Sequence, residues 1–184
     1  MSLRIDPKYF NRFAIIVAIV SILLIAISTI YLHVSAKDDF YKKAEKEQDQ
    51  IAHSYLKDVF KDDSVRVVDF RSRYVVLDFW SSYADPSLYL FKDLEKLQHN
   101  YPGKLTVIAA SVRESRPSVN KYFKKNGHFP FRFVLGNDLY FQLKVPGLPT
   151  FMVYKPNGKL LYSHAGYRNN STLKKLQMAL QQQE

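Results

Sequence analysis

The sequence has 184 residues, 47% of them hydrophobic and 15% aromatic, which is enough to bury the core of one ordinary domain and excludes a disordered chain. The formal net charge is +10, but the lysines are scattered and no nucleic-acid-binding motif occurs, so we expect no nucleic-acid partner. The absence of cysteine excludes a disulfide framework, a thiolate zinc site and an iron–sulfur cluster.

The first segments of the chain predict a membrane anchor. Residues 1–12 carry Arg4, Lys8 and Arg12, and an apolar run without charged side chains follows over residues 13–34. A helix of that length crosses the hydrocarbon core of a bilayer. The positive flank predicts a cytoplasmic tail at residues 1–12 and a domain on the outer, periplasmic or extracellular side.

A cleaved signal peptide is the alternative interpretation of the same run. Val34-Ser35-Ala36 fits a small-residue cleavage site. The apolar run is longer than the 7–15 residues typical of such signals, which favours a retained anchor. The domain is exported under both interpretations.

Residues 35–62 predict a helical stalk. They lack glycine and proline, and their apolar residues recur irregularly at helical spacing. This stalk either packs on the domain or pairs with a second copy. The heptad pattern is broken, so the oligomeric state stays open.

Residues 63–184 predict an α/β sandwich with a central mixed sheet. Strand and helix signals alternate, which requires parallel crossovers, and a hairpin adds antiparallel strands. We expect strands at residues 65–70, 74–80, 105–112 and 131–135, helices at 88–101, 118–125 and 138–143, a hairpin of 150–154 with 159–164, and a last helix capped by Asn170-Ser171.

The segment VVLDFWSSYADPS at residues 75–87 reads as a buried strand, a turn with proline and the start of a helix. It resembles the active-site segment of the thioredoxin superfamily, and most of all membrane-anchored thiol–disulfide oxidoreductases of the TlpA/ResA type, which carry D/N-F-W-A-x-W-C-x-P-C. Residues 78–83 match and Pro86 is in the expected slot, but Ala84 and Ser87 fill both cysteine slots. Disulfide exchange needs a thiolate, so the resemblance implies a domain without redox activity.

A second motif, GLPT at residues 147–150, resembles the G-x-P-T loop of that superfamily. The resemblance implies a cis Leu148–Pro149 bond facing the turn, and a groove that binds an extended peptide through main-chain hydrogen bonds. The alternative is that Pro149 only begins a strand. The residues expected to line the groove are Tyr83, Asp85, Pro86, Leu148, Pro149 and Thr150.

Asp78 is unusual because it lies within an apolar strand, where a carboxylate without a partner is costly. In thioredoxin-like enzymes an acid at this place helps to move protons to and from a buried cysteine. We expect Asp78 to be buried, hydrogen-bonded to Ser87 or water, with a raised pKa. The alternative is a register that places Asp78 at the solvent edge.

No other chemistry is indicated. Ser87 has no recognisable base, and the five histidines are scattered, so we expect no hydrolase, metal or cofactor site. The expected function is a membrane-tethered adaptor or holdase that binds an exported protein or peptide. The alternatives are a TlpA/ResA-type oxidoreductase with engineered replacements at Ala84 and Ser87, and a structural component of an envelope complex.

Overall fold

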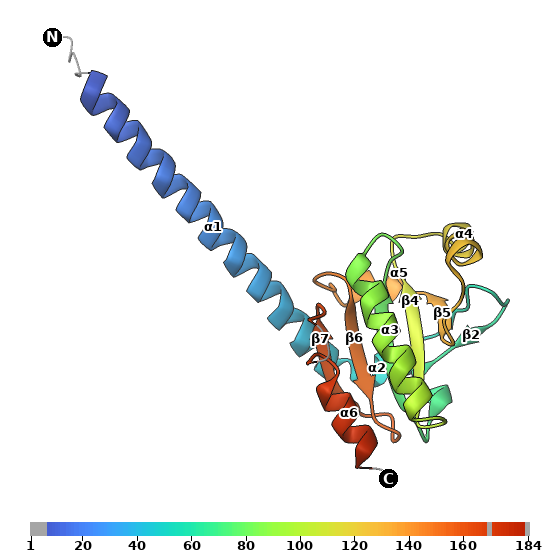
Figure 1. Cartoon of the computed structure of the whole chain (residues 1–184). Coiled ribbons are helices and arrows are strands. Elements are labelled where there is room, and N and C mark those ends of the chain that lie inside the picture. Colours follow the sequence, from blue (N-terminus) through green and yellow to red (C-terminus); the bar gives the residue numbers. More distant parts are fainter. Residues whose placement is uncertain (1–6, 169–170, 183–184) are drawn as a thin grey trace. The chain divides into compact units, whose positions relative to one another are not determined.

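The computed structural model describes residues 7–168 and 171–182 (Figure 1). Contacts divide the chain into two units, Met1–Ala36 and Lys37–Glu184. Helix α1, Pro7–Lys46, begins in the first unit and ends in the second. Arg4 of the predicted basic tail lies outside the described residues.

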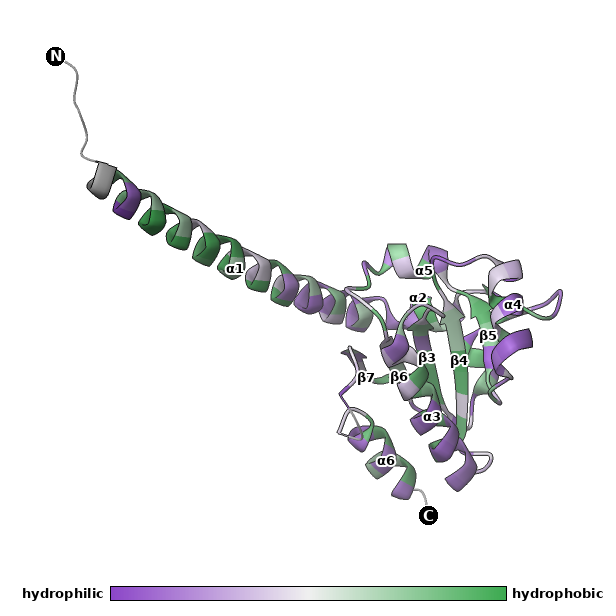
Figure 2. Ribbon diagram, turned by 45° about the horizontal axis from the view of Figure 1, so that its top comes forward, coloured by the Kyte–Doolittle hydropathy of each residue, from purple (hydrophilic) through white to green (hydrophobic). Residues whose placement is uncertain are grey.

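Helix α1 contains the candidate membrane anchor. The segment Phe10–Lys46 is the one helix of the described chain that is long and apolar enough to cross a bilayer. Its large apolar side chains over residues 10–34 are exposed, as expected of a helix whose surroundings are lipid. Figure 2 shows the change along α1 from this apolar part to a hydrophilic end.

A five-stranded mixed sheet forms the centre of the second unit, in the order β5-β4-β3-β6-β7. The strands are β3 (Tyr74–Trp80), β4 (Leu105–Ser111), β5 (Arg132–Leu135), β6 (Thr150–Tyr154) and β7 (Leu160–Ala165). Strands β3, β4 and β5 are parallel, whereas β6 is antiparallel to β3 and to β7. Every residue of β3, β4 and β6 is buried, because helices cover both faces of the sheet. The predicted architecture is therefore confirmed.

One face of the sheet is covered by α3 (Asp85–Asn100) and α6 (Lys174–Gln181), and Figure 1 shows α3 lying across the strands. Val76 of β3 packs there in one cluster with Leu90 and Leu94 of α3 and Leu176 of α6. Helix α4 (Arg116–Asn126) buries its apolar side chains in an adjoining cluster around Trp80. Of the predicted cap of the last helix, Asn170 lies outside the described residues.

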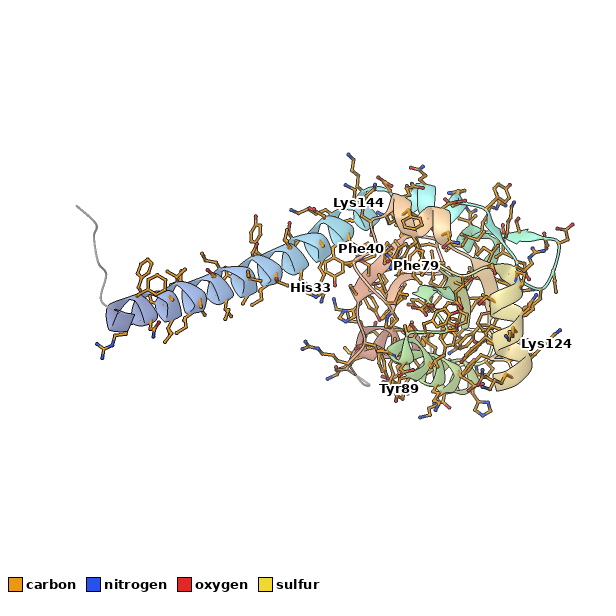
Figure 3. The ribbon with its side chains drawn as sticks, turned by 90° about the horizontal axis from the view of Figure 1, so that it is seen from above. His33, Phe40, Phe79, Tyr89, Lys124 and Lys144 are labelled. Carbon is orange, nitrogen blue, oxygen red and sulfur yellow. The ribbon has the colours of Figure 1, made fainter. Side chains whose placement is uncertain are left out.

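The opposite face is covered by the end of α1, by α2 (Gln48–His53), by the short helix η1 (Val67–Phe70) and by α5 (Asn137–Gln142). Phe40 and Ala44 of α1 and Ile51 of α2 are fully buried in the same cluster as Phe79 of β3. Figure 3 shows Phe40 at the end of α1 near Phe79.

The structure corrects two expected elements. The predicted helix over residues 35–62 ends at His53, because its apolar residues turn into the core and the chain then forms β1 (Leu56–Lys57), which pairs with β2 (Ser64–Val65). The predicted strand over residues 65–70 is wrong for most of its length, because this segment forms η1. Asp69 favours the helix locally: its carboxylate accepts a hydrogen bond from the Arg66 N–H at 2.8 Å and closes a turn.

Candidate functional site

The candidate site lies at the end of β3, where the chain turns into α3. The turn closes with the Ser87 N–H donating to the Ala84 carbonyl at 2.8 Å. Pro86 sits in the first turn of α3, where its missing N–H costs no helical hydrogen bond. Strand β6 runs beside β3, with Thr150 opposite Phe79, so the preceding loop comes next to the turn. The Leu148–Pro149 bond in that loop is cis, as expected.

The predicted groove residues differ in exposure. The Tyr83 side chain is 80% exposed, and Asp85 and Pro86 are also exposed. Leu148 is half-buried, and Pro149 is buried. These residues lie at the same end of the neighbouring strands β3 and β6, and their role in binding stays a prediction.

The loop before β6 offers main-chain groups to a ligand. The Thr150 side chain is fully buried and its hydroxyl donates to the Gly147 carbonyl at 2.7 Å, so it shapes the loop from inside. The Pro149 carbonyl accepts from the Gly166 N–H at 2.7 Å. Within the described ranges, neither the N–H nor the carbonyl of Leu148 has a hydrogen-bond partner. Both groups are therefore available to an extended peptide.

Asp78 is fully buried on β3, between Ala109 of β4 and Phe151 of β6. Burial raises the pKa of its carboxyl group well above the usual value. The expected burial is thus confirmed, and the alternative at the solvent edge is wrong.

The expected hydrogen bond between Asp78 and Ser87 is absent. Neither oxygen of Asp78 nor the Ser87 hydroxyl has a partner among the described residues, although all three atoms are buried. The backbone turn at the start of α3 holds Ser87 in place, and no contact with Asp78 is needed for this. The site therefore contains two polar groups that the surrounding protein leaves unsatisfied.

Glu114 is a residue of this site that the sequence interpretation missed, since it was assigned only to a loop. Its buried carboxylate accepts from the Ser82 N–H at 2.8 Å and from the Ser82 hydroxyl at 2.5 Å. The available signal was its place directly after a buried strand. The ends of the parallel strands β3 and β4 meet, with Trp80 opposite Ser111, so a polar residue just beyond β4 reaches the turn beyond β3.

Trp80, the last residue of β3, lies in the core next to the turn, as expected. Its ring is fully buried and lies 4.9 Å from the Phe91 ring, 5.6 Å from Phe123 and 5.7 Å from Phe133. These contacts fix the end of β3 against α3, α4 and β5. The turn that carries Tyr83 is thus attached to a rigid base.

The arrangement cannot exchange a disulfide, because no thiol is present. The methyl group of Ala84 and the hydroxyl of Ser87 form no bond to sulfur under the conditions in which thiolates exchange. Among the described residues, no group of three or more histidine, aspartate and glutamate side chains could hold a metal ion.

Known proteins resemble this chain at the level of the fold. Residues 72–160 match a family model described as thioredoxin-like, whereas no curated protein matches the chain. A DsbE thiol:disulfide interchange protein of Chlorobium tepidum is 24% identical, with a TM-score of 0.59 over 69% of this chain and 92% of that chain. A thiol-disulfide oxidoreductase of Bacteroides fragilis is 23% identical, with a TM-score of 0.57 over 68% and 96%.

A secreted disulfide oxidoreductase of Mycobacterium tuberculosis, homologous to DsbE of E. coli, is 14% identical, with a TM-score of 0.57 over 71% of this chain and 98% of that chain. The chain therefore contains a thioredoxin-like domain with the fold of the DsbE-type oxidoreductases, in which Ala84 and Ser87 stand at the positions of the two cysteines.

Proposed function

We propose that this protein is a membrane-tethered adaptor or holdase, whose extracytoplasmic domain binds an extended segment of another exported protein without redox chemistry. One observation carries the proposal: the main chain of Leu148 is unpaired at the same end of the paired strands β3 and β6 as the exposed Tyr83 side chain, while Ala84 and Ser87 hold no sulfur. A site that has lost its reactive atoms has kept the groups that bind a polypeptide.

The location outside the cytoplasm is part of the proposal. The apolar segment of α1 follows Lys8 and Arg12, and basic residues beside a membrane helix are retained on the cytoplasmic side. The domain, which follows the helix, is then outside. A secreted protein among the structural relatives agrees with such a place.

Binding through the main chain accounts for both the geometry and the expected selectivity. An extended segment that pairs with Leu148 gains main-chain hydrogen bonds whatever its sequence. Tyr83 adds a large aromatic surface that loses little side-chain freedom on binding. We therefore expect a preference for segments with an apolar side chain near the pairing residue.

The test is capture of partners from envelope extract by the full chain in detergent. The groove variant carries Tyr83→Ala and Leu148→Arg. A matched control carries Tyr89→Ala and Met178→Arg, at exposed positions of α3 and α6. We expect a partner that is lost by the groove variant and retained by the control. A partner retained by both variants would show that the binding site lies on another face, and it would support a structural role in an envelope complex.

A second candidate is an oxidoreductase of TlpA/ResA type whose two cysteines were replaced by engineering. The buried carboxyl group of Asp78 favours it, because an unpaired acid is costly unless a neighbouring group uses it. The codons for positions 84 and 87 in the natural gene decide between the candidates. Two cysteine codons would overturn the adaptor proposal in its present form.

A further inference from the structure

A basic surface on α4 takes no part in the groove described above. The segment from Ser115 to Asn137 contains five lysine and arginine side chains and no aspartate or glutamate. Lys121, Lys124 and Lys125 of this segment are exposed, and none of them forms an ion pair with another described residue. The positive charge of this surface is thus uncompensated within the described chain.

The helical spacing places the three lysines on one side of α4. Val119 and Phe123 are buried and mark the side that faces the core. Lys121, Lys124 and Lys125 occupy helical positions that point away from that side. Figure 3 shows Lys124 on the outer side of α4.

An exposed aromatic ring packs against the same helix through Phe123. Phe60 is 45% exposed, and its ring centroid is 5.7 Å from Phe123, 5.1 Å from His128 and 6.0 Å from Phe133. Three rings thus hold Phe60 in place while much of its surface faces solvent. A fixed, exposed aromatic side chain is a typical anchor of protein interfaces, because little freedom remains to be lost on binding.

Arg116 joins the Phe60 loop to α4. Its guanidinium group donates to the Asp58 carbonyl at 2.6 Å and to the Lys61 carbonyl at 3.3 Å. Asp62 and Asp63 of that loop line a cleft together with Arg116. Arg116 thus faces this cleft, whereas the lysines of α4 are not among its lining residues.

We propose that Phe60 and the three lysines Lys121, Lys124 and Lys125 form a docking surface for an acidic segment of a protein partner. The lysines attract and orient the segment, and Phe60 receives an apolar side chain within it. This surface is separate from the groove at Tyr83 and Leu148, and it does not depend on what that groove binds.

The charge of this surface fits an acidic protein segment, and the surface lies at one edge of the sheet in the second unit. The end of α1 packs at β7, where the Ala165 N–H donates to the Tyr41 hydroxyl at 3.1 Å. Helix α4 packs at β5, where the rings of Phe123 and Phe133 are 4.3 Å apart. Strands β7 and β5 are the two opposite edges of the sheet. Within the second unit, the end of α1 and helix α4 therefore pack at opposite edges of the sheet.

The test measures fluorescence anisotropy of a labelled 12-residue peptide of glutamate and serine with one central leucine. The protein is the full chain in nanodiscs of neutral phosphatidylcholine. We expect binding at low salt that a glutamine analogue of the peptide does not show. The variant Lys121→Gln/Lys124→Gln/Lys125→Gln is expected to weaken binding about tenfold, because three charge contacts of modest strength are lost together. Phe60→Ser is expected to weaken it without changing its dependence on salt.

Two controls make the result specific. Lys155→Gln/Lys159→Gln/Lys174→Gln removes the same charge from exposed positions elsewhere in the domain and is expected to weaken binding less than about twofold. The groove variant Tyr83→Ala/Leu148→Arg is expected to bind the peptide like the wild type. Equal losses in the two lysine variants would reduce the effect to overall net charge and overturn the proposal.

Lipid binding by the same surface is a measurable outcome. The chain has no cysteine, so Lys124→Cys gives a single position for a fluorescent label. The proposal predicts no quenching of this label by spin-labelled lipids in nanodiscs that contain phosphatidylglycerol. Quenching that Lys121→Gln/Lys125→Gln abolishes would show that lipid headgroups occupy the surface and would overturn the proposal.

Discussion

The two faces of the central sheet are packed in different ways. On the face covered by α1, α2 and α5, the β3 side chains Val75, Leu77 and Phe79 join a cluster of apolar residues. On the face covered by α3, the buried acid Asp78 lies between Val76 and Trp80 of the same strand. Six buried side-chain polar atoms have no partner among the described residues: five belong to Asp78, Trp80, Ser87 and Gln98 of β3 and α3, and the sixth belongs to Asn120 of α4.

The two faces thus differ in what they contribute: one stabilises the fold, and the other carries polar groups that do not. The face covered by α1 is typical of a core selected for burial of apolar surface. The face covered by α3 carries unsatisfied polar groups that lower stability, which proteins retain mainly at functional sites. In this chain the polar groups have remained although the thiols are absent.

The largest expected effect is a gain of redox activity on the α3 face. With Ala84→Cys and Ser87→Cys, two thiols stand at the start of α3, where the helix N-terminus favours the thiolate. We expect reduction of insulin disulfides in the presence of dithiothreitol, with one protein disulfide formed for each insulin disulfide reduced, where the parent chain shows none.

Ala84→Cys alone is the control for this gain. It is expected to form a mixed disulfide and then stop, because no second thiol resolves it. A double variant that does not turn over would show that this face has diverged in more than its two sulfur atoms.

The variant Phe40→Ala tests the face of the sheet that is covered by α1. Phe40 is fully buried, and its removal leaves a cavity in the cluster around Phe79, so we expect a loss of about 3–5 kcal/mol in the free energy of unfolding. Fluorescence of Trp80, the single tryptophan, reports unfolding of the full chain in detergent. Phe141→Ala is the matched control, because this ring is 62% exposed, and we expect it to change stability by less than about 0.5 kcal/mol.

Similar losses for Phe40→Ala and Phe141→Ala would contradict the packing of α1 residues on the domain. The result also matters for shortened proteins. A fragment that begins after Ala44 lacks two buried residues of the cluster and is expected to be unstable, although the fragment would contain every residue of the thioredoxin-like match.

Asp78 makes the α3 face sensitive to pH. Its folded-state pKa is raised above the unfolded value of about 3.9, so the folded chain binds the proton more tightly. This group therefore contributes stability that is fully present below about pH 4 and is lost as pH rises through the raised folded pKa. We expect the midpoint of thermal unfolding to fall over that range.

Asp78→Asn should remove this dependence, since the amide does not titrate. The exposed acid Asp85, close by in the sequence, provides the control Asp85→Asn, which is expected to leave the slope unchanged. At neutral pH we expect Asp78→Asn to stabilise the chain by about 1–3 kcal/mol, because a buried, unpaired carboxyl group is removed. An unchanged slope in Asp78→Asn would assign the pH dependence to another group.

Periodicity and turn residues were sufficient to predict most elements of the domain. The buried strands at Tyr74–Trp80 and Leu105–Ser111 read as continuous apolar runs, and the cis bond at Pro149 followed from the resemblance of its loop. Errors concentrated before β3. There, Asp69 forms a local turn through its side chain, and residues 40–52 show a helical pattern whose partner, the sheet, is remote in sequence.

The candidate site was predictable in its positions but not in its contacts. The burial of Asp78 followed from its strand, because every neighbour is apolar. The expected hydrogen bond from Ser87 to Asp78 is absent, and the strand alone could not predict this, since the position of α3 over the strand decides it. Ser82 and Glu114 are 32 positions apart in the sequence and meet only because β3 and β4 pair, so no local pattern contains their contact.

The smallest expected effect concerns this contact, which attaches the turn to the end of β4. Ser82→Ala removes the hydroxyl donor but keeps the main-chain donor to Glu114, so we expect a loss of only about 1 kcal/mol in the free energy of unfolding. Glu114→Gln should cost more, and the two losses should add to more than the loss in the double variant, because both variants remove the same hydrogen bond. Ser163→Ala, in β7, is the control for the loss of a serine hydroxyl.

Glu114 positions the turn that carries Tyr83, so its removal should act on binding as well as on stability. We expect Glu114→Gln to weaken capture of a groove partner at a temperature where the domain is still folded, because the turn gains freedom that binding must remove. Binding that survives Glu114→Gln but not Tyr83→Ala would show that the aromatic ring itself, rather than a fixed turn, carries recognition.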